Sequence, residues 1–200
     1  MIAIIDYGVG NLKSVYKALK KLGIEAKITD DIYDINNSKG IILPGVGAFK
    51  DAMKNLKEKN IISCIKENIA SGKPLLGICL GMQLLFEKSF EDGEWEGLGI
   101  LSGEVVRFNE NLKIPHMGWN RLKINKDNKI LKYIKEGDYV YFVHSYYVKT
   151  KDDNVICVSD YGKRFPAIVG KDNVFGMQFH PEKSGETGLA LLKAFGEMIK

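Results

Sequence analysis

The segment Pro74-Leu75-Leu76-Gly77-Ile78-Cys79-Leu80-Gly81-Met82-Gln83-Leu84-Leu85-Phe86 joins two apolar runs through a cysteine between glycines. Residues 75–78 form a short apolar run, which is typical of a strand buried on both faces of a parallel sheet. The pentapeptide 77–81 has the form of the G-x-S-x-G nucleophile elbow, with cysteine in place of serine. A sharp strand-to-helix turn brings the two glycine positions together, where a Cβ would clash. We therefore predict a strand, a tight turn carrying Cys79 as nucleophile, and an apolar helix.

Upstream of this segment, strand and helix patterns alternate. Short apolar runs at 2–6, 26–28 and 40–43 predict strands. Apolar residues at helical spacing predict helices over 12–22, 49–56 and 61–69, with Asn11 as the N-cap of the first. Strands separated by helices indicate a parallel sheet covered on both faces.

Downstream of about residue 97 the pattern changes to short strand-like segments separated by turns. These segments span 104–107, 139–143, 155–159 and 174–178, and they predict antiparallel or mixed strands added to the sheet. The chain ends in an amphipathic helix that places Leu189, Leu192, Phe195 and Ile199 on one face. No repeat, low-complexity segment or linker interrupts residues 1–200, which predicts one domain. The expected fold is a three-layer α/β domain with a mostly parallel central sheet.

Composition excludes several classes of protein. The formal net charge of +4 comes from lysines scattered along the chain rather than from a basic stripe, which disfavours nucleic-acid binding. No run approaches the roughly 20 apolar residues that span a bilayer, and the N-terminus lacks the pattern of a signal peptide. The three cysteines are too widely spaced for a disulfide framework or a zinc knuckle. We expect a cytoplasmic protein without a metal or a cofactor.

Cys79 has a second interpretation, that of a small buried hydrophobic residue in a glycine-rich turn. The other cysteines carry no comparable motif. Cys64 lies among isoleucines on a predicted helix, and Cys157 alternates within a predicted strand. We interpret both as core residues.

A thiolate nucleophile needs a base, and the base needs a third group that orients it. His180 follows a predicted strand, and Pro181 favours an extended backbone at His180. Residues two apart in an extended run point to the same side, so Glu182 can face the same site as His180. Taken alone, His180 favours interpretation as a surface histidine at a strand end, and its combination with the Cys79 elbow reverses that preference. His116 and His144 have no carboxylate two residues away, and we interpret them as structural or rim residues.

The developing oxyanion needs hydrogen-bond donors. The backbone N–H of Leu80, directly after the nucleophile, is one candidate. A second is the turn Pro44-Gly45-Val46-Gly47, which follows the third strand and would lie beside the elbow, where its glycines allow close approach of the backbone. Seen by itself, this tetrapeptide is also consistent with an ordinary turn.

Together these residues resemble the class I, triad-type glutamine amidotransferases. The two signatures are the elbow 77–83 and the segment Gln178-Phe179-His180-Pro181-Glu182. More narrowly, the chain is similar to the glutaminase subunits of imidazole glycerol phosphate synthases. That similarity rests on the segments Asp6-Tyr7-Gly8-Val9-Gly10-Asn11, Pro44-Gly45-Val46-Gly47, His116-Met117-Gly118-Trp119-Asn120 and His144-Ser145-Tyr146, and on the Lys-Ser after Glu182.

The resemblance implies a flavodoxin-like core and a Cys79–His180–Glu182 triad that hydrolyses L-glutamine through a thioester. It also implies an oxyanion hole formed at Val46, Gly47 and Leu80, and glutamine contacts from Gly45, Gly47, Gln83, Ser145 and Tyr146. The partner it implies is a (β/α)₈-barrel cyclase that receives the ammonia, and the expected partner-facing rim consists of Asn11, Trp119, Tyr141 and Lys183. Val46 lengthens the oxyanion turn. We hypothesise that this turn presents a carbonyl, not an N–H, to the oxyanion site until the partner docks.

Three alternatives remain open at this stage. Glutaminase subunits of anthranilate or aminodeoxychorismate synthase use the same triad. A stand-alone cysteine hydrolase of γ-glutamyl or peptide bonds would need no partner. A binding module on a flavodoxin-like sheet would keep its ligand after Cys79→Ala.

Overall fold

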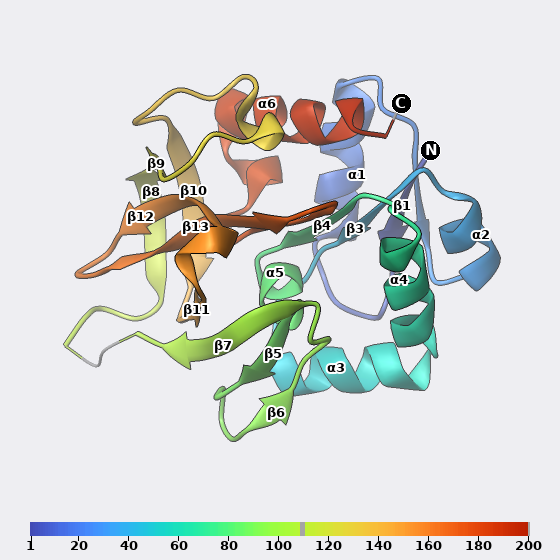
Figure 1. The fold of residues 1–200 in the computed structure, drawn as a ribbon, viewed down its shortest axis with the longest axis horizontal. Coiled ribbons are helices and arrows are strands. Elements are labelled where there is room, and N and C mark those ends of the chain that lie inside the picture. Colours follow the sequence, from blue (N-terminus) through green and yellow to red (C-terminus); the bar gives the residue numbers. More distant parts are fainter. Residues whose placement is uncertain (109–110, 200) are drawn as a thin grey trace.

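The computed structural model of the chain, which describes residues 1–108 and 111–199, is built around an eight-stranded mixed sheet (Figure 1). The strand order is β2-β1-β3-β4-β14-β13-β12-β9. Strands β2, β1, β3, β4 and β14 pair in parallel, whereas β13, β12 and β9 continue the sheet in antiparallel pairs. The bounds of these strands are β1 (Ile2–Ile5), β2 (Ala26–Thr29), β3 (Gly40–Leu43), β4 (Leu75–Ile78), β9 (Lys123–Ile124), β12 (Val155–Asp160), β13 (Arg164–Lys171) and β14 (Val174–Met177).

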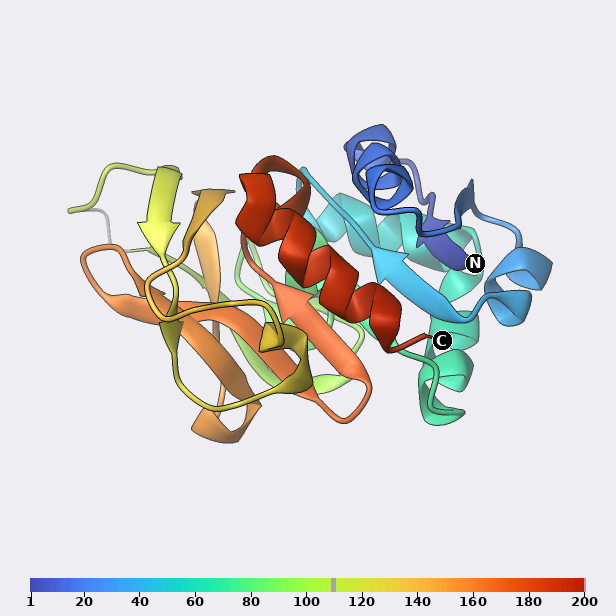
Figure 2. The ribbon, with the colours of Figure 1, turned by 90° about the horizontal axis from the view of Figure 1, so that it is seen from above.

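Helices cover both faces of this sheet, as the alternation of strand and helix predicts. Alternate residues of β1 show the division: Ile2 and Ile4 belong to the core cluster that holds α1 and α6 residues, and Ala3 and Ile5 to the cluster that holds α3 and α4 residues. In Figure 2, α6 (red) runs diagonally across the strands on the side nearer the viewer. The helices are α1 (Leu12–Lys21), α2 (Ile32–Asn37), α3 (Phe49–Glu58), α4 (Ile61–Ala70), α5 (Leu80–Leu84) and α6 (Gly185–Glu197).

Two smaller sheets flank the main one. One has the order β11-β7-β5-β6, and the other pairs β10 with β8. Three 3₁₀ turns complete the described elements. The bounds are β5 (Phe86–Ser89), β6 (Trp95–Glu96), β7 (Leu101–Arg107), β8 (His116–Arg121), β10 (Tyr139–His144), β11 (Tyr146–Lys149), η1 (Lys129–Leu131), η2 (Asp152–Asn154) and η3 (Pro181–Lys183).

The expected three-layer α/β architecture is confirmed, but the placement of the later strands differs from the expectation. The segments predicted at 104–107 and 139–143 lie in the smaller sheets and do not extend the main one. The segment predicted at 174–178 forms β14, which is parallel to β4 inside the main sheet. Local alternation identifies a strand but carries no information about its neighbour, because pairing is decided by contacts distant in sequence.

Helix α2 was not predicted. It is short, and its signal is the cap: the Asp31 side chain accepts a hydrogen bond of 2.8 Å from the backbone N–H of Tyr33. Within residues 1–108 and 111–199, no helix has the length and apolar character needed to cross a membrane.

Candidate active site

The turn between β4 and α5 has the geometry of a nucleophile elbow. Cys79 has φ 54° and ψ −109°, a region that non-glycine residues rarely occupy, and its N–H donates a hydrogen bond of 2.7 Å to the Met177 carbonyl. An added Cβ at Gly77 would lie 2.6 Å from the Gly81 carbonyl oxygen. One at Gly81 would collide with the Leu43 carbonyl. The two glycines are therefore required by the close packing of the turn, as the sequence predicts.

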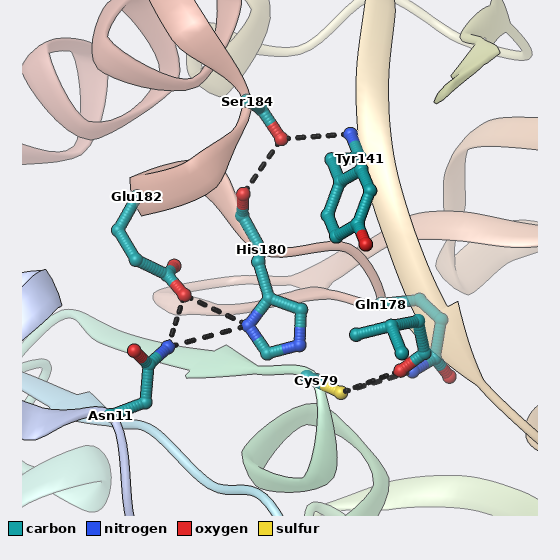
Figure 3. A network of polar contacts seen from close by, with 8 residues as sticks. Asn11, Cys79, Tyr141, Gln178, His180, Glu182 and Ser184 are labelled. Carbon is teal, nitrogen blue, oxygen red and sulfur yellow. Dashed lines mark hydrogen bonds and ion pairs between the residues drawn. The ribbon is translucent and has the colours of Figure 1, made fainter. Parts of the chain in front are cut away.

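His180 and Glu182 form a buried pair at the end of β14. His180 is extended, with φ −99° and ψ 96°, and its Nδ1 lies 2.8 Å from Oε1 of Glu182 (Figure 3). Both side chains are almost completely buried. The two side chains meet as predicted, but the extended 180–182 run expected from the sequence is wrong: only His180 is extended, and Pro181–Lys183 form the 3₁₀ turn η3, which brings Glu182 to the imidazole.

The protonation of His180 is set by its neighbours. Burial lowers the pKa of His180, but interactions with the Cys79 thiolate and the Glu182 carboxylate outweigh it and together raise this pKa to about 9. Nε2 of His180 is buried and has no hydrogen-bond partner among the described residues. It is therefore the ring nitrogen that remains for proton exchange with Cys79 and a substrate.

Asn11 completes the pair on the side away from the nucleophile. Its Nδ2 donates a short hydrogen bond to Oε1 of Glu182 and lies 3.4 Å from Nδ1 of His180 (Figure 3). Asn11 occupies the N-cap position of α1 with φ 77°, but its side chain makes no capping bond, contrary to the expectation. The sequence places Asn11 on the rim, and its contact with Glu182 is the feature that sequence reasoning missed.

A pocket of about 380 Å³ opens beside Cys79 and His180. It brings together most of the predicted nucleophile, oxyanion and glutamine-binding residues, namely Val46, Gly47, Cys79, Leu80, Gln83, Ser145, Tyr146 and His180. Gly45 is buried and does not line the pocket. Glu91, Val143 and His144 also line the pocket and were not predicted to do so.

Glu91 brings a carboxyl group to this pocket. Its Oε2 accepts a hydrogen bond of 2.6 Å from the N–H of Phe49 at the start of α3. Burial raises the pKa of Glu91, and the Phe49 N–H opposes this effect. No local sequence signal marks Glu91, because its site role depends on contact with a helix more than 40 residues away.

The turn Pro44–Gly47 packs against the elbow. The N–H of Leu80 donates a hydrogen bond of 3.3 Å to the Gly45 carbonyl, so this donor is occupied. The hydroxyl of the buried Tyr7 donates a hydrogen bond of 2.6 Å to the Pro44 carbonyl and anchors the start of the turn. Gly47 has φ 112°, a conformation that favours glycine, and Val46 is exposed. The Gly45 carbonyl thus occupies the position to which the N–H of Leu80, the proposed oxyanion donor, points.

Gln83 lies at the centre of a hydrogen-bonded line that leads to the nucleophile. Its Nε2 donates to the Tyr146 carbonyl and to Oε1 of Gln178, both at 3.1 Å. Nε2 of Gln178 in turn lies 3.8 Å from Sγ of Cys79. Because a main-chain carbonyl can only accept, the Tyr146 oxygen fixes the orientation of both amides. Gln178 therefore presents an N–H to the sulfur.

The predicted rim lies on the strands and the turn beside His180. Trp119 of β8 is half exposed and packs edge-to-face on Tyr141 of β10, with ring centroids 5.9 Å apart. The Tyr141 carbonyl accepts a hydrogen bond of 3.1 Å from the N–H of His180, and Lys183 is exposed in the next turn. Tyr141 is therefore hydrogen-bonded directly to the backbone of the His180 segment, and Trp119 packs on Tyr141.

The remaining cysteines and histidines are buried. Sγ of Cys64 donates a 3.3 Å hydrogen bond to Oδ1 of Asn36, and burial raises the pKa of Cys157 to about 12, which agrees with core packing. His116 and His144 are also buried, which excludes the rim interpretation for both. Among residues 1–108 and 111–199, no cluster of potential metal ligands occurs.

Comparison with known proteins gives the same picture. The family described as glutamine amidotransferase class-I matches residues 3–198. The imidazole glycerol phosphate synthase subunit HisH of Caldanaerobacter subterraneus subsp. tengcongensis is 61% identical over 201 residues, covering 100% of this chain and 99% of the relative. The subunit of the same name from Aquifex aeolicus is 54% identical over 194 residues, covering 96% and 94%.

Solved structures share the fold at low sequence identity. The structure of PurLQS from Thermotoga maritima superposes with a TM-score of 0.78 at 24% identity, covering 100% of this chain and 98% of that chain. A crystal structure of a glutamine amidotransferase gives 0.76 at 22% identity, covering 97% and 99%. The full-length family match and the high identity to HisH subunits establish that this chain belongs to the class-I glutamine amidotransferases.

Proposed function

We propose that this chain is the glutaminase subunit of an imidazole glycerol phosphate synthase, which hydrolyses L-glutamine and passes the ammonia to a cyclase partner. The observation that carries this proposal is the meeting of the strained Cys79 elbow with the buried His180–Glu182 pair in one pocket. The narrower assignment is supported by relatives that carry the name HisH at 52–61% identity over the full length of the chain.

The first half of the reaction forms a thioester. Sγ of Cys79 attacks the side-chain carbonyl carbon of glutamine, and the proton on Nε2 of His180 passes to the amide nitrogen as the C–N bond breaks. Ammonia leaves, and glutamate remains bound to Cys79 through its γ-carbon. Glu182 holds the imidazole through Nδ1 and stabilises its protonated form, while Asn11 holds Glu182.

The second half releases glutamate. Water gives a proton to Nε2 of His180 and attacks the thioester carbon, and Cys79 departs as the thiolate. The amide N–H of Gln178, 3.8 Å from the sulfur, stabilises negative charge on Sγ at the beginning and end of the cycle.

Glutamine binding is assigned to Gln83, Ser145, Tyr146, Gly45 and Gly47. Both bonds of Gln83 use Nε2, so its Oε1 accepts no hydrogen bond from the described residues. That oxygen and the nearby carboxyl of Glu91 suit the α-ammonium group of the substrate by charge. Gly45 contributes by shaping the turn behind the pocket, where a Cβ would lie 2.5 Å from the Tyr7 hydroxyl.

The oxyanion hole is assigned to the backbone at Leu80 and at Val46–Gly47. The hydrogen bond from Leu80 to the Gly45 carbonyl would have to open before Leu80 could donate to an oxyanion. This arrangement supports the hypothesis that the turn is blocked in the free chain and rearranges when the partner docks.

The partner is a (β/α)₈-barrel cyclase that uses ammonia and a ribotide to make imidazole glycerol phosphate and an aminoimidazole carboxamide ribotide. Ammonia released into bulk water is protonated and loses its nucleophilicity, so the two sites must face each other. The rim of Trp119, Tyr141, Lys183 and Asn11 beside the pocket is the proposed docking face. The three buried free cysteines suit a reducing cytoplasm as the location.

The test is glutamate release from glutamine by the purified chain, alone and with a matching barrel synthase and its ribotide. We expect strong stimulation by the partner, and a loss of at least about 10⁴-fold in Cys79→Ala. Full activity without a partner would indicate a stand-alone hydrolase. Activity that survives Cys79→Ala would reject the proposed chemistry.

A further inference from the structure

A line of hydrogen bonds runs from the exposed Asp160 carbonyl at the end of β12, through the buried His116–His144 contact, to the Tyr146 carbonyl beside the pocket. Nδ2 of Asn120 bonds the Asp160 carbonyl at 2.8 Å and Nε2 of His116 at 3.2 Å. Nδ1 of His116 lies 3.0 Å from Nε2 of His144, and Nδ1 of His144 lies 2.7 Å from the Tyr146 carbonyl. The line thus ends on the carbonyl that also accepts the hydrogen bond from Gln83.

The direction of every bond in this line follows from its last acceptor. The Tyr146 carbonyl can only accept, so Nδ1 of His144 carries the proton. Nε2 of a neutral His144 must then accept, which places a proton on Nδ1 of His116. Nε2 of His116 accepts in turn from Asn120, which has two N–H groups and uses both.

The surroundings keep both rings neutral. His116 stacks on Tyr161 and Phe142, with centroids 4.0 and 5.1 Å away, and His144 packs on Phe108 and Phe165, each 5.2 Å away. Neither imidazole bonds to a carboxylate, and the hydrogen bond from His144 to the Tyr146 carbonyl does not outweigh the loss of solvation that a charged ring would suffer. Burial lowers the pKa of His116 to about 4 and that of His144 to about 3, which agrees with the neutral tautomers.

The Tyr146 carbonyl therefore accepts two hydrogen bonds, one from His144 and one from Gln83. His144 donates from the β8–β10 sheet, and Gln83 donates from α5, the helix that follows β4 of the main sheet. Both lone pairs of the oxygen are used, and both Ser145 and Tyr146 line the pocket. The segment 145–146 is thereby held at a defined distance from the helix that carries the elbow.

We infer that His144, supported by His116 and Asn120, is a positioning residue that holds the Ser145–Tyr146 segment and Gln83 in the arrangement that binds glutamine. The inference rests on the proposed glutaminase function and adds residues to it that touch no reacting atom. A packing role alone would require only ring volume at this position, whereas a positioning role requires the Nδ1–H donor of His144.

Two matched variants separate these roles. In His144→Asn the amide Nδ2 lies close to the position of Nδ1 and can still donate to the Tyr146 carbonyl. In His144→Gln the longer amide replaces Nε2 and leaves the Tyr146 carbonyl without this donor. Both variants lose the ring and its aromatic contacts, so they are controls for each other.

The measurement is glutaminase kinetics in complex with the barrel partner and ribotide, together with glutamine binding to each variant in a Cys79→Ala background. We expect His144→Gln to raise the KM and the dissociation constant for glutamine by about tenfold, with kcat changed much less. We expect His144→Asn to stay within about threefold of the unchanged chain. If a His144 variant fails to give a cooperative thermal transition, His116→Asn and His116→Gln repeat the comparison one bond farther away.

Equal KM values in the Asn and Gln variants would overturn the inference and leave the glutaminase function intact. An effect confined to kcat would overturn it equally. Absence of glutaminase activity in the unchanged chain with its partner would instead reject the proposed function on which the inference rests.

Discussion

His180 and the pair His116–His144 are buried to a similar degree, but their environments drive their pKa values in opposite directions. His180 lies between the Glu182 carboxylate and the Cys79 thiolate, and its pKa is raised to about 9. His116 and His144 lie among aromatic rings with only neutral hydrogen-bond partners, and their pKa values fall to about 4 and about 3. Burial acts in the same direction at all three sites, so the charged neighbours make the difference.

The two regions also contribute oppositely to stability as pH changes. His180 has a raised pKa, so its stabilising contribution is complete below about 6.5 and is lost as the pH rises through about 9. His116 and His144 have lowered pKa values, so their contribution is complete above about 6.5 and is lost as the pH falls toward 4 and 3. One region thus exchanges protons during turnover, and the other keeps a fixed pattern of donors and acceptors throughout the neutral range.

Removing the carboxylate from the His180 region should give the largest effect within this comparison. In Glu182→Gln, burial and the missing negative charge lower the pKa of His180, so less of the imidazolium is available to protonate ammonia. We expect kcat to fall by about 10³-fold and the alkaline limb of the kcat profile to move from about 9 to lower pH. The measurement is the pH dependence of glutamate release in complex with the partner.

Glu186→Gln is the matched control for Glu182→Gln. Glu186 lies four residues later at the start of α6, and its side chain is 93% exposed. Its removal should leave both kcat and the alkaline limb unchanged. An alkaline limb near 9 in Glu182→Gln would show that the carboxylate does not set the protonation of His180.

The parts of the site that sequence could predict are those whose geometry is local. The elbow follows from sterics within 77–81, and His180 and Glu182 are only two residues apart, so their pairing is local even though η3 turns where an extended backbone was expected. Asn11 and Glu91 could not be found in this way. Asn11 meets Glu182 across 171 positions of sequence, and Glu91 meets Phe49 across 42.

The fold shows the same division between local and distant information. Apart from α2, the early strands and helices were predicted to within two residues of their bounds, because each β–α unit carries its own apolar run and turn. The pairing of β14 with β4, and of β8 with β10, depends on contacts between distant segments. His144 lies opposite His116 in the β8–β10 pairing. The hydrogen bond between the two histidines could therefore not be predicted before the register of this pairing was known.

A smaller effect is expected at Asn11, whose substitution tests how far the hydrogen-bonded network around His180 and Glu182 extends. Asn11→Ala removes the donor to Glu182 but no charge, so the carboxylate becomes less well oriented. We expect kcat to fall by about tenfold with little change in KM for glutamine, measured with the partner present. Asn60→Ala is the matched control, because Asn60 is also a left-handed N-cap residue without a side-chain cap bond, and it is exposed. Equal kinetics for the two variants would remove Asn11 from the network.

The smallest perturbation is a titration of the unchanged chain, which tests the comparison without any substitution. Nitrogen NMR of the three histidine rings distinguishes the tautomers and follows each ring with pH. We expect His116 and His144 to remain neutral with the proton on Nδ1, because the Tyr146 carbonyl forces this tautomer on both. The common neutral tautomer in water carries the proton on Nε2, so the predicted pattern is distinctive. His180 should titrate alone, near 9. A proton on Nε2 of His116 or His144 would contradict the hydrogen bonds that lead to Tyr146. Titration of either ring near 6.5 would show that its surroundings do not keep it neutral, and the contrast with His180 would be lost.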